Sequence, residues 1–138
     1  MKIPSVIVQN FLAIGKAEFS LDSLGLVHVY GINNDETSAD SNGSGKSSLG
    51  DAISWCLWGS TARGLGSDEV ISTDPATNKP KKGGTMVDTH IDDDGDEYRV
   101  VRYRNYPKHK NDLHVFKLNS AGDWDDLSTG TNAATQKL

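Results

Sequence analysis

The sequence predicts an α/β fold in which a mixed sheet lies around one helix, with antiparallel hairpins beside it. Three observations predict this fold. Apolar and polar residues alternate in several short segments, apolar residues recur at helical spacing after residue 48, and an Asp-Gly pair separates two strand-like runs. The 138 residues suit one domain, so we treat 1–138 as a single unit.

The first sixty residues contain three predicted strands and a helix. Val6 to Val8 is a short β-branched run, alternation at Ala17, Phe19 and Leu21 indicates a half-buried strand, and Leu26 to Tyr30 is continuously apolar. A helix is predicted from one apolar stripe, formed by Leu49, Ala52, Ile53, Cys56 and Leu57. Gly59 stands where a C′ glycine ends a helix. Trp55 and Trp58 lie off the stripe, and we expect both to bury against the following loop.

The second half is predicted to be rich in hairpins. Residues 59–84 form a long loop with a brief element at 68–71. Strands at 85–91 and 98–104 flank an Asp94-Gly95 turn, and a strand at 113–118 precedes a turn at 120–123. The acidic residues around Gly95 do not have the spacing of an EF-hand calcium site, so we interpret this segment as a hairpin turn. Residues 128–138 are predicted to form an N-cap and the opening turns of a helix that begins near Asn132.

Composition excludes several classes of protein. Cys56 is the single cysteine, so it forms no internal disulfide and no zinc site built on cysteine pairs. No apolar run approaches the roughly 18 residues of a membrane span, and the start has no secretory signal pattern, so we expect a cytoplasmic protein. The net charge of −5 restricts any DNA contact to a local basic patch.

The strongest chemical signal is a glycine-rich loop between a predicted strand and the helix. This loop comprises Asn42, Gly43, Ser44, Gly45, Lys46, Ser47 and Ser48. Successive backbone N–H groups and the positive end of a helix are suited to a triphosphate. Lys46 is expected to reach the β- and γ-phosphates of ATP, and the Ser47 hydroxyl to bind Mg²⁺, with Ser48 a minor partner. The alternative is a glycine-serine turn that only caps the helix.

The loop departs from the usual spacing at its first glycine. The motif requires glycine six residues before the lysine, where this chain has Asp40, and Gly31 lies nine residues further back. Removing residues 34–42 would join Gly31 to Gly43 in an uninterrupted motif. We therefore interpret 31–48 as the phosphate loop, with a nine-residue insertion at about 34–42.

The motifs together resemble the SbcC family of SMC-like DNA-repair ATPases, which includes the large subunits of tailed-phage recombination exonucleases. The resemblance covers Val6 to Phe11 with Phe19, the phosphate loop through Leu49, Asp51 to Ile53, Leu57 to Gly59 with Arg63, and Tyr98 to Arg102. It implies the N-terminal lobe of a P-loop NTPase head of the ABC/SMC type. RecF-type proteins and ABC transporter ATPases share the loop itself.

The resemblance also implies a function. We expect the ATP-binding lobe of an ATPase that couples ATP binding and hydrolysis to DNA-end processing in double-strand-break repair. The implied partners are an SbcD-like nuclease, double-stranded DNA ends and a second, identical ATPase head. No motif of the C-terminal lobe or the coiled coil occurs in these residues, so we expect this chain alone to be inactive. The alternatives are a stand-alone nucleotide or DNA sensor without hydrolysis, and part of an ABC-type transport ATPase.

A basic segment with interleaved aromatic residues is the second candidate site. It contains Arg99, Arg102, Arg104, Lys108 and Lys110, and this composition suits DNA contact, although a solvated basic face is the simpler interpretation. His28, His90, His109 and His114 show no ligand spacing, so we expect structural or exposed roles. No catalytic residues are assigned, and nuclease activity is not predicted for this chain.

Overall fold

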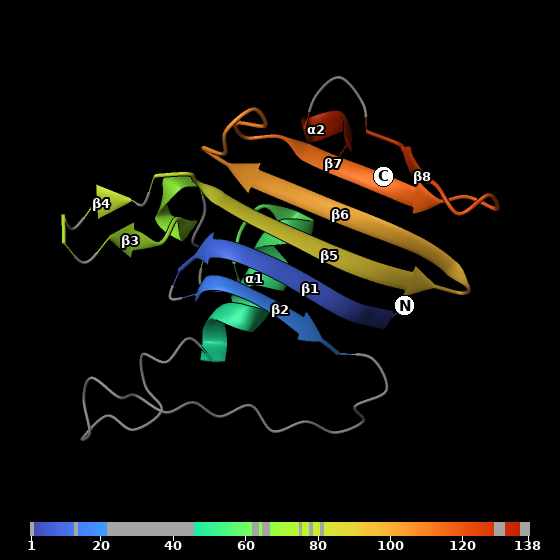
Figure 1. Cartoon of the computed structure of the whole chain (residues 1–138), viewed down its shortest axis with the longest axis horizontal. Helices are drawn as coiled ribbons and strands as arrows, with labels where there is room; N and C mark the ends of the chain where they lie inside the picture. The colour runs from blue at the N-terminus through green and yellow to red at the C-terminus, as the bar shows by residue number, and fades with distance from the viewer. Residues whose placement is uncertain are drawn as a thin grey trace.

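A six-stranded antiparallel sheet forms the centre of the protein (Figure 1). The computed structural model describes residues 2–12, 14–21, 46–61, 64, 67–74, 76–77, 79–80, 82–128 and 132–135. The strands, in spatial order, are β2 (Ile14–Ser20), β1 (Lys2–Phe11), β5 (Thr85–Asp93), β6 (Asp96–Arg104), β7 (Leu113–Leu118) and β8 (Trp124–Asp126). Every pairing between them is antiparallel. The predicted strand at 26–30, like the predicted insertion at 34–42, lies outside the described residues.

The remaining elements are short, apart from one helix. They are α1 (Lys46–Trp58), the 3₁₀ turn η1 (Ser67–Val70), a two-stranded pair of β3 (Thr73–Asp74) and β4 (Lys79–Pro80), and α2 (Asn132–Thr135). Helix α1 lies behind one face of the sheet and contacts β1, β5 and β6, while α2 lies beside β7 (Figure 1). Among the described residues, no helix has the length and apolar character that crossing a membrane requires.

The hydrophobic core lies between α1 and the central strands. Val6, Val8 and Val87 are fully buried and pack with Ala52 and Cys56 of the helix. These residues share one face of β1 and β5 because alternate side chains of a strand point to the same side. The predicted strand at 6–8 and the predicted helix are confirmed. Of the predicted stripe only Ala52 and Cys56 are buried, while Leu49, Ile53 and Leu57 are partly exposed, because the face turned to the sheet also contains Trp55.

The two tryptophans of α1 have different environments. Trp55 is 2% exposed and its ring centroid lies 5.6 Å from that of Phe11, so it belongs to the core. Trp58 is 67% exposed, and the expectation that it is buried is therefore wrong. Trp58 follows Cys56 by two positions, about 200° around a helix, so its side chain faces away from the sheet.

The β5–β6 hairpin has the predicted turn. Asp94 and Gly95 have φ of 55° and 90°, as a type I′ turn requires, and the Gly95 N–H donates to Asp92 Oδ1 at 3.2 Å. The turn at 120–123 is also confirmed, since Asn119 Oδ1 accepts N–H groups from Ala121 and Asp123. Strand β8, which follows that turn, was not predicted, because its three residues are too few to show a pattern.

The long segment between α1 and β5 is tied to the end of β1. Ser72 Oγ donates to the Leu12 carbonyl at 2.6 Å, and the Leu12 N–H donates to the Val70 carbonyl at 2.8 Å. The predicted element at 68–71 is confirmed as η1. Gly84 ends the segment with φ of 66°, and a Cβ there would lie 2.2 Å from the Asn105 carbonyl oxygen, so only glycine fits.

The predicted helix near Asn132 is confirmed, but Ser128 is not its cap. Helix α2 begins at Asn132, and Ser128 Oγ instead accepts the Val115 N–H at 2.9 Å. Asn132 Oδ1 accepts the Leu113 N–H at 3.1 Å. Both side chains therefore accept hydrogen bonds from backbone N–H groups of β7. This pairing between segments separated in the chain could not be inferred from the local sequence.

Candidate nucleotide-binding site

Helix α1 begins at Lys46, the residue where the glycine-rich motif places the start of the helix. Asn42, Gly43, Ser44 and Gly45 lie outside the described residues, whereas Lys46, Ser47 and Ser48 form the first turn of α1. The first N–H groups of a helix have no partner within the helix and carry partial positive charge. The first turn of α1 contains no acidic residue, so nothing in it opposes an anion.

Buried side chains hold α1 against the sheet. Ser48 is 5% exposed and Asp51 is 7% exposed, so the second turn is already enclosed. Further along, Cys56 Sγ donates to the Val87 carbonyl at 3.3 Å and to the Val100 carbonyl at 3.1 Å. Burial raises the pKa of Cys56 to about 11, so the thiol stays protonated and remains a donor at neutral pH. The helix is thereby fixed to β5 and β6.

An arginine of β6 interacts with the C-terminal end of α1. Arg102 Nε donates to the Cys56 carbonyl at 3.0 Å, and its guanidinium lies 5.9 Å from the centroid of the Trp55 ring. A cation at this end of a helix is favourable because the last carbonyls carry partial negative charge. Gly59, with φ of 84°, ends the helix as predicted, and its N–H donates to the Trp55 carbonyl at 2.7 Å.

Arg99 binds a buried carboxylate on the neighbouring strand. Asp88 is 4% exposed, and both of its oxygens accept hydrogen bonds from Arg99, one from Nε and one from Nη2. The bond to Asp88 raises the pKa of Arg99, and the guanidinium also lies 5.7 Å from the centroid of the Phe116 ring. Arg99 therefore stabilises β5, β6 and β7 against one another.

The basic segment does not form one continuous surface. Arg99 and Arg102 are three positions apart on β6, so their side chains point to opposite faces of the sheet. Arg104 lines a pocket of about 160 Å³ together with Trp55, Arg102 and Asn132. Lys108 and Lys110 lie exposed on the turn after β6, where both have positive φ. The two lysines are the members of the predicted set that are exposed to solvent.

The structure brings together a group of side chains that sequence spacing did not reveal. His109, Asp112 and His114 place one potential ligand atom each within 4.8 Å of one another. Ligand spacing among the histidines was not predicted from the sequence, so the proximity of His109 and His114 is a finding of the structure. His90 packs edge-on against Trp124, with ring centroids 5.9 Å apart, and His28 lies outside the described residues. The H-x-x-D-x-H spacing of these three residues is the sequence signal that could have indicated the cluster.

The fold and the helix that starts at Gly-Lys-Ser define the N-terminal lobe of a P-loop NTPase head. The chain belongs to the AAA domain family, whose model matches residues 5–136. Over 91 residues the chain is 36% identical to the SbcC subunit of the nuclease SbcCD from Deinococcus radiodurans, a match that covers 64% of this chain and 9% of the relative. The predicted resemblance to SbcC-like ATPases is confirmed.

Two solved structures of the recombination mediator protein RecF are also similar. One, described as RecF-ATPrS, has a TM-score of 0.48 and 15% identity over 90% of this chain and 28% of RecF. The other, described as RecF-ATP, has a TM-score of 0.45 and 19% identity over 88% of this chain and 29% of RecF. The chain thus spans under a third of the length of these relatives.

Proposed function

We propose that the chain binds ATP at the N-terminus of α1, through residues Asn42 to Ser48. The observation that carries this proposal is the position of α1, which begins at Lys46 and is packed on the core through Ala52, Trp55 and Cys56. A helix held in this way presents its free N–H groups in a constant direction. A nucleotide phosphate is the ligand that such an arrangement suits best.

The residue types at this point also fit a magnesium ion. Mg²⁺ prefers oxygen ligands and is bound with substrate phosphates and few protein groups. In this proposal Lys46 contacts the β- and γ-phosphates, the Ser47 hydroxyl is the protein ligand of Mg²⁺, and Ser48 assists. When bound, the ion offsets the negative charge of the triphosphate.

The family and the relative together support a wider role. We propose that the chain is the ATP-binding lobe of an SbcC-like ATPase in DNA double-strand-break repair or recombination. In this role ATP binding and hydrolysis are coupled to DNA-end processing by an SbcD-like nuclease, and a second identical head completes the ATP site. The support is the AAA domain match and the 36% identity to a protein that is itself named as part of a nuclease.

Hydrolysis requires groups beyond the phosphate loop. Transition-state stabilisation comes from charges that close around the transferred phosphoryl group, in addition to those that bind the ground state. The SbcC resemblance implies that a water-activating carboxylate and a signature motif supply these groups, and neither motif occurs in the 138 residues. We therefore expect the isolated chain to bind Mg-ATP weakly and to hydrolyse it negligibly.

Replacement of the loop lysine tests the site. Lys46→Ala should weaken ATP binding by about 10- to 100-fold in calorimetry, since it removes one charge-assisted contact with phosphate. Lys82→Ala is the matched control, because Lys82 is an exposed lysine of the loop before β5. Equal affinity in wild type and Lys46→Ala would refute the assignment. Steady hydrolysis that co-purifies with the chain and disappears in Lys46→Ala would instead show that these residues are sufficient for activity.

A further inference from the structure

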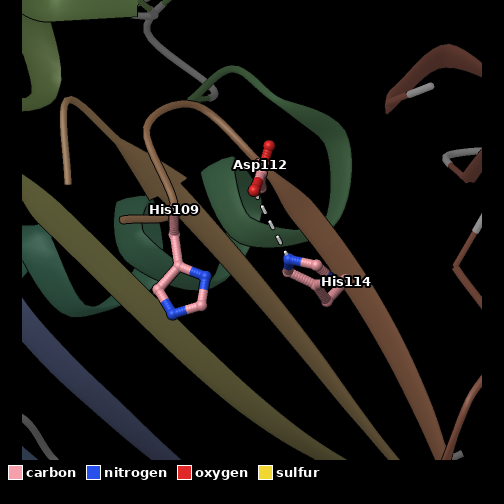
Figure 2. Close-up of side chains that lie close together, drawn as sticks. All are labelled: His109, Asp112 and His114. Carbon is pink, nitrogen blue, oxygen red and sulfur yellow. Dashed lines mark ion pairs between the residues drawn. The ribbon is translucent and has the colours of Figure 1, made fainter. Parts of the chain in front are cut away.

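We propose that His109, Asp112 and His114 form a binding site for a transition-metal ion, with Zn²⁺ as the preferred ion, at the turn between β6 and β7. Figure 2 shows the three side chains, with a nitrogen of the His109 ring turned toward His114 and Asp112 above His114. Their potential ligand atoms all lie within 4.8 Å of one another. Two imidazoles and a carboxylate are a ligand set that zinc uses when it retains one open position.

The distance between Asp112 and His114 fits a shared ion better than a hydrogen bond. Asp112 Oδ2 lies 3.7 Å from His114 Nε2, which is beyond hydrogen-bond range. Bonds of about 2.0–2.2 Å at a tetrahedral centre place neighbouring ligand atoms about 3.4 Å apart. His114 Nε2 is also buried and has no hydrogen-bond partner in the part of the chain that the structure describes. A polar atom in that state requires a partner, and a metal ion would supply it.

The second nitrogen of His114 faces a hydroxyl and a carboxylate, the latter beyond direct hydrogen-bond distance. Its Nδ1 lies 3.8 Å from Asp126 Oδ2 and 3.5 Å from Ser128 Oγ. A carboxylate behind a ligating imidazole fixes the orientation of the ring and increases its basicity. Asp126 is itself held in place, because its Oδ1 accepts the Ser128 N–H at 2.8 Å. The site therefore draws support from β8 as well as from β7.

Backbone hydrogen bonds already hold the turn that carries His109 and Asp112. Tyr106 and Lys110 exchange two backbone hydrogen bonds of 2.9 and 2.7 Å, and the Asp112 N–H donates to the His109 carbonyl at 3.0 Å. The His109 ring stacks on Tyr103 with centroids 4.4 Å apart. Binding would immobilise few further groups, so little conformational entropy is lost. Asp112 is 52% exposed, which leaves access for the ion and for a water as fourth ligand.

The competing explanation is a protonated His114 between two carboxylates, with no metal. That arrangement would be an ordinary ion pair and would involve Asp112 and Asp126 alone. It leaves His109 with its stacking on Tyr103 alone and gives it no part in binding an ion. His109 is therefore the residue that separates the two explanations.

Calorimetric titration of the tag-free chain with Zn²⁺ tests the site, with Co²⁺ as a spectroscopic probe. We expect one saturable Zn²⁺ per chain and visible Co²⁺ absorption typical of four- or five-coordinate nitrogen and oxygen ligands. His109→Ala and Asp112→Ala should each weaken Zn²⁺ binding by at least about 100-fold, and Asp126→Asn by about 10- to 100-fold. His90→Ala, which removes a histidine of β5, and Lys46→Ala should bind Zn²⁺ like wild type.

Circular dichroism of each variant ensures that the comparison is made between folded chains. The absence of saturable Zn²⁺ binding by wild type would overturn the proposal without reference to any variant. Wild-type affinity in folded His109→Ala would overturn it as well, and would favour the ion-pair explanation. Because Lys46→Ala is expected to lose ATP and keep Zn²⁺, failure of the nucleotide site and failure of the metal site are distinguishable.

Discussion

The buried thiol of Cys56 should make the protein less stable in alkaline solution. Cys56 is fully buried, and desolvation raises its pKa from 9.0 to about 11. Between these values the unfolded chain ionises its thiol while the folded chain does not. Ionisation then stabilises the unfolded state, so this contribution to stability is complete below pH 9 and is lost as the pH rises toward 11.

The magnitude follows from the difference between the two pKa values. Each pKa unit corresponds to about 1.4 kcal/mol, so complete loss amounts to roughly 3 kcal/mol. At pH 10 about 1 kcal/mol is already lost. That is a measurable fraction of the stability of a small domain, which is typically about 5–15 kcal/mol.

Urea denaturation at pH 8 and pH 10 measures this effect. Burial also raises the pKa of Tyr103, so the decisive comparison is with Cys56→Ala, which changes the thiol alone. Wild type should lose about 1 kcal/mol more than Cys56→Ala between the two pH values, whatever the absolute stability of the variant. An equal loss in the two proteins would show that the thiol ionises as readily in the folded state as in the unfolded state, and would refute this reasoning.

Three further predictions concern the charged residues and the loop. Arg99→Met should lower the free energy of unfolding by about 3 kcal/mol because it leaves the buried Asp88 carboxylate unpaired, and adding Asp88→Asn should restore most of that loss in the same urea assay. The double variant Lys108→Ala with Lys110→Ala should weaken DNA binding by the same factor for all DNA sequences and should reduce the slope of log affinity against log salt concentration by about 2. An unchanged slope would show that this turn does not contact DNA. Deletion of residues 34–42 should leave nucleotide binding equal or stronger in calorimetry, and a folded deletion variant that no longer binds would show that the insertion contributes contacts of its own.

The sequence by itself determined the features that depend on neighbouring residues. Alternation at Ala17 and Phe19 predicted β2, helical spacing from Leu49 predicted α1, and Asp94-Gly95 predicted the turn of the β5–β6 hairpin. Each of these signals is local, because side-chain periodicity and turn conformation are set within a few residues of the chain. The family resemblance rests on the same local motifs, and the AAA domain match confirms it.

Only the tertiary structure decided which partners the polar side chains find. Arg99 of β6 forms an ion pair with Asp88 of β5, Arg102 donates a hydrogen bond to a carbonyl near the end of α1, and Ser128 accepts a hydrogen bond from an N–H of β7. The same holds for the approach of His109 to His114, which depends on how the turn folds back over the sheet. These contacts depend on strand register and on the packing of segments distant in sequence, and a local pattern contains no information about either.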